Sequence, residues 1–254
     1  MLTVISPAKK LDYSGTQTAQ PFTQPALIEH AKELHKGLKN LSPQDVCALM
    51  GLSDKLGALN YERFQEWHTP FNAENAKQAV LAFKGDVYQG LDAGSMTQAE
   101  LEWAQNNLCI LSGLYGVLRP LDLMQPYRLE MGTKLVNPRG KDLYHFWDGI
   151  INQHLNSLLT GSNPVLVNLA SNEYFKATKE KTLSCRIVTP IFMDNKNGTY
   201  KTISFFAKKA RGSMAAFIIK NRITNVEDLK GFDNNDYIFN SALSDTDKWV
   251  FTRD

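Results

Sequence analysis

The run Leu108-Cys-Ile-Leu-Ser112 is the clearest indication of how this chain folds. It is short, apolar and followed by glycine, which is typical of a buried strand. Comparable runs occur at Leu2 to Ser6 and at Val165 to Leu169. Apolar spacing and a capping box at Thr97 to Glu100 predict helices between these strands, at residues 25–39, 98–107 and 141–159. The chain therefore combines a sheet with helices that pack on it.

The second half of the chain breaks a strict alternation of strands and helices. Asn195 to Gly198 has the composition of a turn and separates two strand-like segments, 186–193 and 199–206, so we expect an antiparallel hairpin there. A basic helix is expected from about residue 207 to 221, and further strands at 80–83, 236–240 and 248–252. No internal repeat or long linker marks a boundary. We therefore expect one compact α/β (α+β) domain over residues 1–254, with a mixed sheet flanked by helices.

Composition excludes several classes of protein. With 254 residues, of which 43% are hydrophobic, the chain can bury a large core without disulfides or structural metals. No apolar window is long enough to cross a membrane, and the first residues lack the apolar stretch of a signal peptide, so we expect a cytoplasmic protein. Cys47, Cys109 and Cys185 show no paired spacing and are expected to be free thiols. Oxidation of one of them as a peroxide sensor is the less favoured alternative.

The positive charge of the chain is concentrated in one segment. Residues 174–226 contain eleven Lys and Arg against two acidic residues, and no acidic residue occurs from Asn195 to Val226. A solvated surface normally mixes both signs, so this excess favours a polyanionic partner such as nucleic acid or another phosphate ligand. The residues that we expect to contact it are Lys176, Lys201, Lys208, Lys209 and Arg211.

Residues 46–59 lie between two predicted helices and resemble a helix-hairpin-helix, a motif whose tight turn points backbone N–H groups at a DNA phosphate. Gly51, Leu52 and Ser53 would form the turn, and Lys55 would lie beside the phosphate. Ser53 stands where the motif usually has its second glycine, so it must adopt the backbone of the turn without glycine's freedom. The alternative is an ordinary connection between two helices.

Polar side chains collect in three loops that could build a pocket, residues 83–91, 112–130 and 168–176. If the chain is an enzyme, Asp86, Glu130 or Glu173 would serve as acid or base. Lys9 or Lys84 would serve as nucleophile or phosphate ligand. Arg119 and Arg128 would bind anions, and Tyr115 and Tyr127 would serve as stacking platforms. The alternative is a structural loop whose charges pair with one another. No cofactor motif occurs and the five histidines form no recognisable ligand set, so we expect neither a cofactor nor a metal site.

Five motifs give the chain a close, nearly full-length resemblance to the YaaA family of bacterial peroxide-stress-response proteins. They are Ser6 to Asp12, Phe83 to Tyr88, Leu111 to Gly132, Asn168 to Lys176 and Phe205 to Gly212. The resemblance implies a cytoplasmic protein that answers hydrogen peroxide by keeping free iron low, which limits oxidative damage to DNA. It also implies a compact fold of unusual topology, a positively charged cleft, a helix-hairpin-helix and binding to DNA. It brings no established reaction, so it transfers no catalytic residue.

These observations support two functions of different classes. In the favoured one, the protein binds DNA with little sequence preference through its basic segment, and Gly51, Ser53 and Lys55 add contacts. In the other, the polar loops form the site of an enzyme that acts on a nucleic acid or a nucleotide-like metabolite. Direct iron sequestration is a weaker third hypothesis, because without a ligand set we expect iron to fall indirectly.

Overall fold

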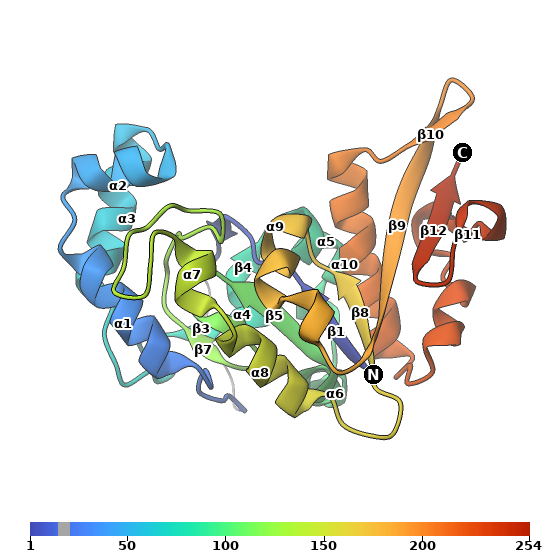
Figure 1. Cartoon of the computed structure of the whole chain (residues 1–254), viewed down its shortest axis with the longest axis horizontal. Helices are drawn as coiled ribbons and strands as arrows, with labels where there is room; N and C mark the ends of the chain where they lie inside the picture. Colours follow the sequence, from blue (N-terminus) through green and yellow to red (C-terminus); the bar gives the residue numbers. More distant parts are fainter. Residues whose placement is uncertain (15–20) are drawn as a thin grey trace.

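A computed structural model describes residues 1–14 and 21–254 of the chain. Its centre is an eight-stranded mixed sheet in the order β11-β12-β9-β8-β1-β5-β6, with β10 paired to β9 (Figure 1). The strands are β1 (Leu2–Ile5), β5 (Leu108–Ser112), β6 (Gly116–Leu118), β8 (Val165–Leu169), β9 (Arg186–Lys196), β10 (Thr199–Lys201), β11 (Ile238–Phe239) and β12 (Lys248–Arg253). β1, β5, β8, β9 and β12 run parallel, whereas β6, β10 and β11 are antiparallel to their neighbours.

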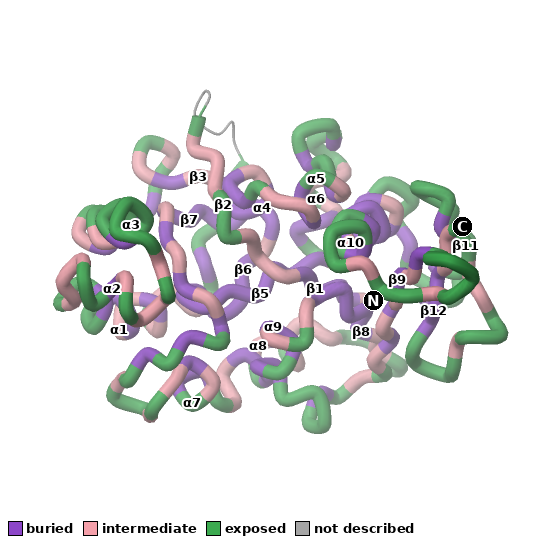
Figure 2. Tube along the Cα trace, turned by 90° about the horizontal axis from the view of Figure 1, so that it is seen from above, coloured by how far each residue is buried: buried purple, intermediate pink, exposed green. Residues whose placement is uncertain are grey.

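Helices cover both faces of this sheet, and every residue of β1 and β5 is buried. Figure 2 shows α5 (Asp86–Leu91), α6 (Gln98–Asn107) and α10 (Ser204–Lys220) on one side, and α7 (Leu143–Trp147), α8 (Ile150–Leu158) and α9 (Asn172–Phe175) on the other. α5 and α10 approach closely at Gly212, where an added Cβ would lie 1.8 Å from the carbonyl oxygen of Val87. Burial on both faces explains why the central strands are apolar throughout.

Two arms extend from this centre (Figure 1). The first arm consists of α1 (Ile28–Lys39), α2 (Pro43–Met50) and α3 (Asp54–Glu66), and the second contains the β9–β10 hairpin and the first turns of α10. Between the first arm and the sheet lie α4 (Ala79–Ala82), the strand pair β2 (Lys10–Leu11) with β4 (Phe83–Lys84), and the pair β3 (Lys77–Gln78) with β7 (Leu123–Met124). Short 3-10 helices are η1 (Ala93–Ser95), η2 (Lys176–Thr178), η3 (Glu180–Thr182), η4 (Val226–Gly231), η5 (Asn234–Asp236) and η6 (Ser241–Leu243).

Buried aromatic side chains fasten the first arm to the sheet. Trp67, directly after α3, donates from its indole Nε1 to the Tyr115 hydroxyl at 2.8 Å. Tyr115 lies between β5 and β6 and donates in turn to the carbonyl oxygen of Gln125 at 3.3 Å. Each polar ring atom therefore keeps a partner inside the core, as buried tyrosine and tryptophan usually require.

The mixed sheet flanked by helices in one compact α/β domain is confirmed. The antiparallel hairpin is also confirmed, with Tyr200 opposite Asn195. The strand predicted at 80–83 is wrong, because α4 occupies most of it; a short apolar run looks alike in a buried strand and a buried helix.

Two further elements have different bounds from those predicted. The single helix expected at 141–159 is divided into α7 and α8 at Asp148, whose φ of +35° cannot continue a helix. The strand expected at 199–206 ends at Lys201, and α10 already begins at Ser204.

Candidate nucleic-acid interface

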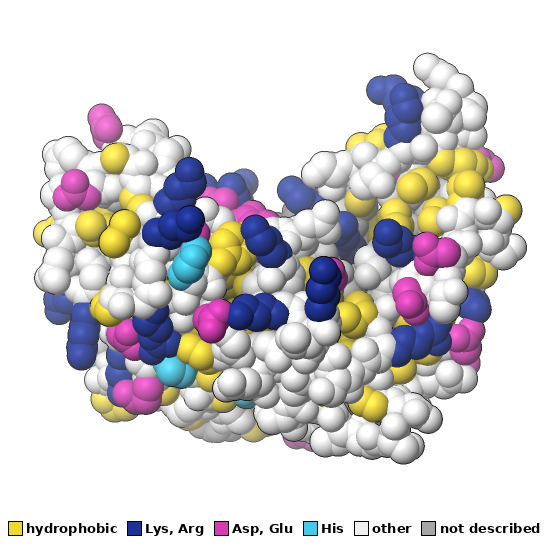
Figure 3. All heavy atoms as spheres, in the orientation of Figure 1, with side chains coloured by type: hydrophobic (Ala, Val, Ile, Leu, Met, Phe, Trp, Pro, Cys, Tyr) yellow, Lys and Arg dark blue, Asp and Glu magenta, His cyan; other side chains and the backbone are white. Residues whose placement is uncertain are grey.

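A hollow lies between the two arms, and we call it the cleft (Figure 3). The carboxyl ends of β1, β8 and β9 point toward this side of the molecule (Figure 1). Figure 3 shows Lys and Arg side chains gathered along its walls and floor. The order of the parallel strands reverses at β1, since β5 lies on one side of it and β8 on the other. Open α/β sheets bind ligands in the crevice outside the strand ends at such a reversal.

The floor of the cleft begins where β1 and β8 end. The backbone N–H of Ser171 donates to Ser6 Oγ at 2.8 Å, and the hydroxyl of Tyr88 in α5 donates to the carbonyl oxygen of Ser6 at 3.1 Å. Burial raises the pKa of the Tyr88 hydroxyl far above its ordinary value, so it remains a donor. Ser6 and Ser171 were not predicted as site residues, although their position directly after buried strands was the available signal.

Four of the predicted pocket residues come together on this floor. Lys9 Nζ lies 2.7 Å from Glu130 Oε2, and Arg128 Nη2 donates to Glu130 Oε1 at 3.2 Å. Glu173 accepts the backbone N–H of Gly132 at 2.9 Å, which joins the loop after β8 to the loop that carries Glu130. The buried Nε of Arg128 has no hydrogen-bond partner within the described residues. An acceptor atom of a bound ligand would give this N–H group a hydrogen bond. Without one, a buried donor lowers the stability of the fold.

Lys84 and Asp86 lie on the neighbouring loop. β4 pairs with β2 so that Lys84 stands opposite Lys10. Lys84 Nζ is 2.8 Å from Asp12 Oδ2, and this hydrogen bond holds the pKa of Asp12 below its ordinary range. Asp86 is half-buried in the first turn of α5. Lys84 is thus already paired with a carboxylate in this structure.

Three predicted pocket residues have structural contacts instead. Tyr115 is fully buried and Tyr127 is 4% exposed, so neither is available as a stacking platform, contrary to the expectation. The Tyr127 hydroxyl is 2.6 Å from Ser112 Oγ, which accounts for its polar atom. Arg119 donates to the carbonyl oxygen of Gln105 at 2.6 Å and to Asn106 at 2.7 Å, and so ties the end of β6 to α6. Tyr115, Tyr127 and Arg119 therefore hold the fold together, as expected for a structural loop.

Four predicted DNA-binding lysines are exposed: Lys176 at the end of α9, Lys201 on β10, and Lys208 and Lys209 in α10. None forms an ion pair within residues 1–14 and 21–254. Lys176 Nζ lies 4.6 Å above the ring of Tyr144. Because no carboxylate neutralises them, their charge is available to a polyanion.

Arg211 differs from the neighbouring lysines. It is only partly exposed, and burial lowers the pKa of its guanidinium. Helical spacing puts Arg211 three residues after Lys208 on a neighbouring part of the α10 surface, but tertiary packing covers it. Its expected contact with DNA is therefore less direct than that of the exposed lysines.

The predicted hairpin region is a pair of helices, α2 and α3, with a short turn. Gly51 ends α2 with φ +60°, in the left-handed region that favours glycine. Ser53 has φ −69° and ψ 157°, an extended backbone that any residue adopts, so serine fits the turn without strain. Lys55 is exposed in the first turn of α3, next to the exposed Asp54. Its contact with a DNA phosphate stays a prediction.

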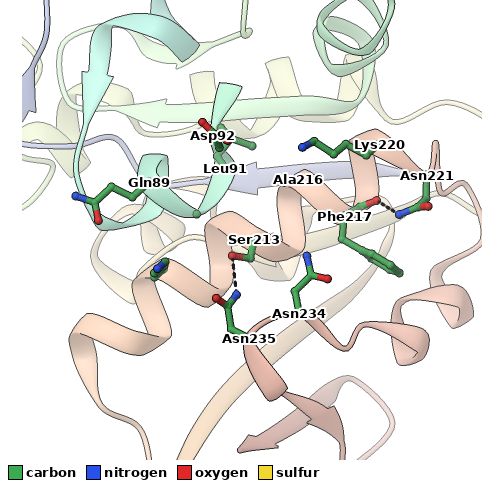
Figure 4. A pocket seen from close by; sticks show the side chains of 12 residues that line it. Gln89, Leu91, Asp92, Ser213, Ala216, Phe217, Lys220, Asn221, Asn234 and Asn235 are labelled. Carbon is green, nitrogen blue, oxygen red and sulfur yellow. Dashed lines mark hydrogen bonds between the residues drawn. The ribbon is translucent and has the colours of Figure 1, made fainter. Parts of the chain in front are cut away.

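A second hollow of about 600 Å³ lies between α5, α10 and η5 (Figure 4). Asn235 Nδ2 donates to Ser213 Oγ across it at 3.1 Å. Lys209 and Lys220 both line this hollow, and Lys220 lies at the end of α10, which runs away from the cleft (Figure 1). Lys208 and Lys220 are thus about 18 Å apart along the helix axis. The far end of α10 therefore offers exposed cations at this distance from Lys208, although Lys220 shares the hollow with Lys209.

Within residues 1–14 and 21–254, no three His, Cys, Asp or Glu side chains are grouped so that they could hold a metal ion. None of the helices described there has the length and apolar character needed to span a bilayer. Cys109 is buried, and burial raises the pKa of its thiol to about 12. Since the thiolate is the reactive form, this environment does not favour oxidation of Cys109.

Fold and site together define a class of α/β protein in which two arms enclose a basic cleft above a mixed sheet. Residues 1–243 match the family described as peroxide stress protein YaaA. Over its full length, the chain is 60% identical to a UPF0246 protein of Saccharophagus degradans and 58% identical to one of Teredinibacter turnerae, covering 99% of each. A UPF0246 protein of Aliivibrio fischeri is 57% identical over all of this chain and 98% of its own length. The chain belongs to the peroxide stress protein YaaA family, which confirms the resemblance and gives it a role in peroxide stress.

Proposed function

We propose that the protein binds DNA in the cleft, with little preference for sequence, through phosphate contacts from Lys176, Lys201, Lys208 and Lys209. One observation carries the proposal. Of the eleven cations between residues 174 and 226, only Lys179 and Arg186 pair with a carboxylate among the described residues. Unpaired lysines that replace condensed counterions on DNA give tight, salt-dependent binding that does not depend on sequence.

The α2–α3 hairpin on the opposite arm supports the same proposal. Lys55 is exposed there, and no side chain caps the backbone N–H groups at the start of α3. The N–H groups of Gly51 and Leu52 already donate to the carbonyl oxygen of Cys47. A duplex or strand in the cleft would then meet cations from one arm and N–H groups from the other. Backbone N–H groups at a helix start are common phosphate ligands.

In the proposed role, this binding protects DNA during peroxide stress. In the cytoplasm, the protein covers or holds DNA and limits its damage by iron-derived radicals, and any effect on free iron is indirect. The described residues include no ligand group for iron, so the proposal assigns protection to the DNA contact and not to iron storage. Peroxide-treated cells that carry a variant without DNA binding should accumulate DNA damage like cells that lack the protein.

The experiment that tests DNA binding is a charge reversal with a matched control. Lys208→Glu with Lys209→Glu should abolish the binding of labelled duplex DNA in fluorescence anisotropy. Lys220→Glu with Arg222→Glu makes the same change of charge at exposed positions near the other end of α10 and should leave binding nearly intact. Equal loss in both variants would show that only net charge matters, and unchanged binding in the first would refute the proposed site.

A second candidate function is favoured by the grouping of Lys9, Arg128, Glu130 and Glu173 on the cleft floor. The unpartnered Nε of Arg128 supports a ligand with acceptor oxygens, as an enzyme of nucleic acid or nucleotide-like metabolites would need. Calorimetric titration with nucleoside monophosphates and with inorganic phosphate tests this candidate. Binding to the wild type that is lost in Arg128→Gln supports it, and no heat with any of these probes excludes it.

A further inference from the structure

Phe205 and Phe206 are exposed in the first turn of α10, with 51% and 39% of their surfaces accessible. Large exposed apolar side chains that adjoin one another usually mark a contact site. These two lie at the start of α10, on the second arm. The small cavity that they line also has Lys209, Tyr237 and Arg253 in its walls.

The two rings are held in place from one side. The guanidinium of Arg253 lies 4.6 Å from the ring centre of Phe206 and 4.7 Å from that of Tyr237. Arg253 is itself fixed by an ion pair with the buried Asp194. Phe205 packs on Phe206 with ring centres 5.6 Å apart and an interplanar angle of 65°. Phe206 is therefore supported from behind, and Phe205 is the outer, more accessible ring.

The surroundings of these rings are positively charged. Lys208 and Lys209 follow in the next turn of α10, and Lys201 lies at the end of β10, a few residues before the rings. The cavity lined by Phe205, Phe206 and Lys209 measures about 90 Å³. That is well below the ~300 Å³ of a typical ligand pocket. A planar group can lie against the exposed face of Phe205, but it cannot enter beneath it.

We propose that Phe205 stacks on an unpaired nucleobase, so that the nucleic acid bound in the cleft is single-stranded or locally unwound. This inference rests on the proposed function and adds the class of substrate to it. An aromatic ring flanked by cations is the combination that single-strand-binding surfaces use, because every base has a stacking face and every nucleotide a phosphate. In an intact duplex the bases are stacked on one another, and only the phosphates can reach Lys208 and Lys209.

A protein partner fits this surface less well. Together the exposed parts of the two rings amount to about one whole phenylalanine, ~200 Å². Stable protein interfaces bury ~800 Å² on each partner and are depleted in lysine. Here the apolar area is small and lysines adjoin it, which favours a nucleobase with its phosphate.

The test compares single-stranded and duplex DNA with the full chain. Phe205→Ala should weaken the binding of oligothymidylate by about tenfold, whereas the binding of a duplex of the same length should not change. Phe205→Trp should restore single-strand binding. Leu243→Ala removes another exposed apolar side chain, 49% accessible in η6, and should change neither. A strand that contains 2-aminopurine adds a direct readout, because stacking on Phe205 quenches its fluorescence.

The outcomes separate this inference from the proposed function. If the wild type binds neither DNA, both fail. A second outcome is that the wild type binds DNA while Phe205→Ala lowers the affinity for single-stranded and duplex DNA equally, or lowers neither affinity. In both cases DNA binding stands and stacking on Phe205 is refuted. Loss of a dimer in Phe205→Ala, seen by size-exclusion chromatography with light scattering, would assign the rings to self-association and would also overturn the inference.

Discussion

Replacing Lys208 and Lys209 by glutamine is expected to reduce the salt dependence of DNA binding by a calculable amount. Both side chains are exposed and lack a carboxylate partner in the described part of the chain, so each can neutralise one phosphate. Each such contact on duplex DNA contributes about 0.9 to the slope of log affinity against log salt concentration. Loss of two contacts therefore lowers the slope by about 1.8.

This change of slope is large enough to measure. Between about 50 and 200 mM salt, a slope that is smaller by about 1.8 means that the affinity of the variant falls roughly tenfold less than that of the wild type. Fluorescence anisotropy at several salt concentrations gives both slopes. Lys220→Gln with Arg222→Gln, near the far end of α10, is the control and should keep the slope of the wild type. A double variant of Lys208 and Lys209 with an unchanged slope would refute the placement of phosphates at these residues.

Three further predictions concern the fold and its titration. Gly212→Ala should destabilise the protein by about 1–3 kcal/mol in urea unfolding, since its Cβ would collide with the backbone of Val87. Gly37→Ala, which has open space around it in α1, should stabilise the protein by up to about 1 kcal/mol. Equal effects of the two substitutions would contradict the packing of α5 on α10. Burial raises the pKa of Asp122 to about 6. As the pH rises, the unfolded chain therefore loses this proton at a lower pH than the folded protein does. The free energy of unfolding should fall by about 3 kcal/mol between about pH 4 and a pH above 6. The free energy of unfolding of Asp122→Asn should lack this pH-dependent loss. If wild type and variant change with pH in parallel, Asp122 is not its source. After exposure of the folded protein to hydrogen peroxide, mass spectrometry should find the Cys109 thiol unmodified, because burial raises its pKa to about 12; a sulfenic acid there would show the opposite.

The central strands could be predicted from sequence because burial on both faces demands apolar side chains at every position, as in β1, β5 and β8. The strand expected at 236–240 contains β11. The two-residue strands β3 and β7 were not predicted, because two residues are too few to show an alternation of apolar and polar side chains. The break at Asp148 depends on how α7 and α8 pack and is not visible in helical spacing. Local sequence thus predicted the strands of the central sheet better than the two-stranded sheets beside it.

The candidate site shows the same division. Arg128, Glu130 and Glu173 were predicted because polar residues that follow buried strands gather at one edge of a sheet. Tyr115 and Tyr127 looked equally suitable, but each hydroxyl finds a partner in the core, so the rings are buried. Sequence does not distinguish a tyrosine that has an internal partner from one that is exposed. The exposure of Phe205 could not be predicted for the same reason, because it depends on which neighbours cover the ring.

Protection of individual lysines from acetylation, measured by mass spectrometry with and without bound DNA, tests the position of the nucleic acid most directly. DNA should protect Lys176, Lys201, Lys208 and Lys209 together, while the exposed Lys220 and the exposed Lys36 and Lys39 of α1 should react as they do in the free protein. Protection of α1 and Lys220 with no change in the cleft would contradict the account.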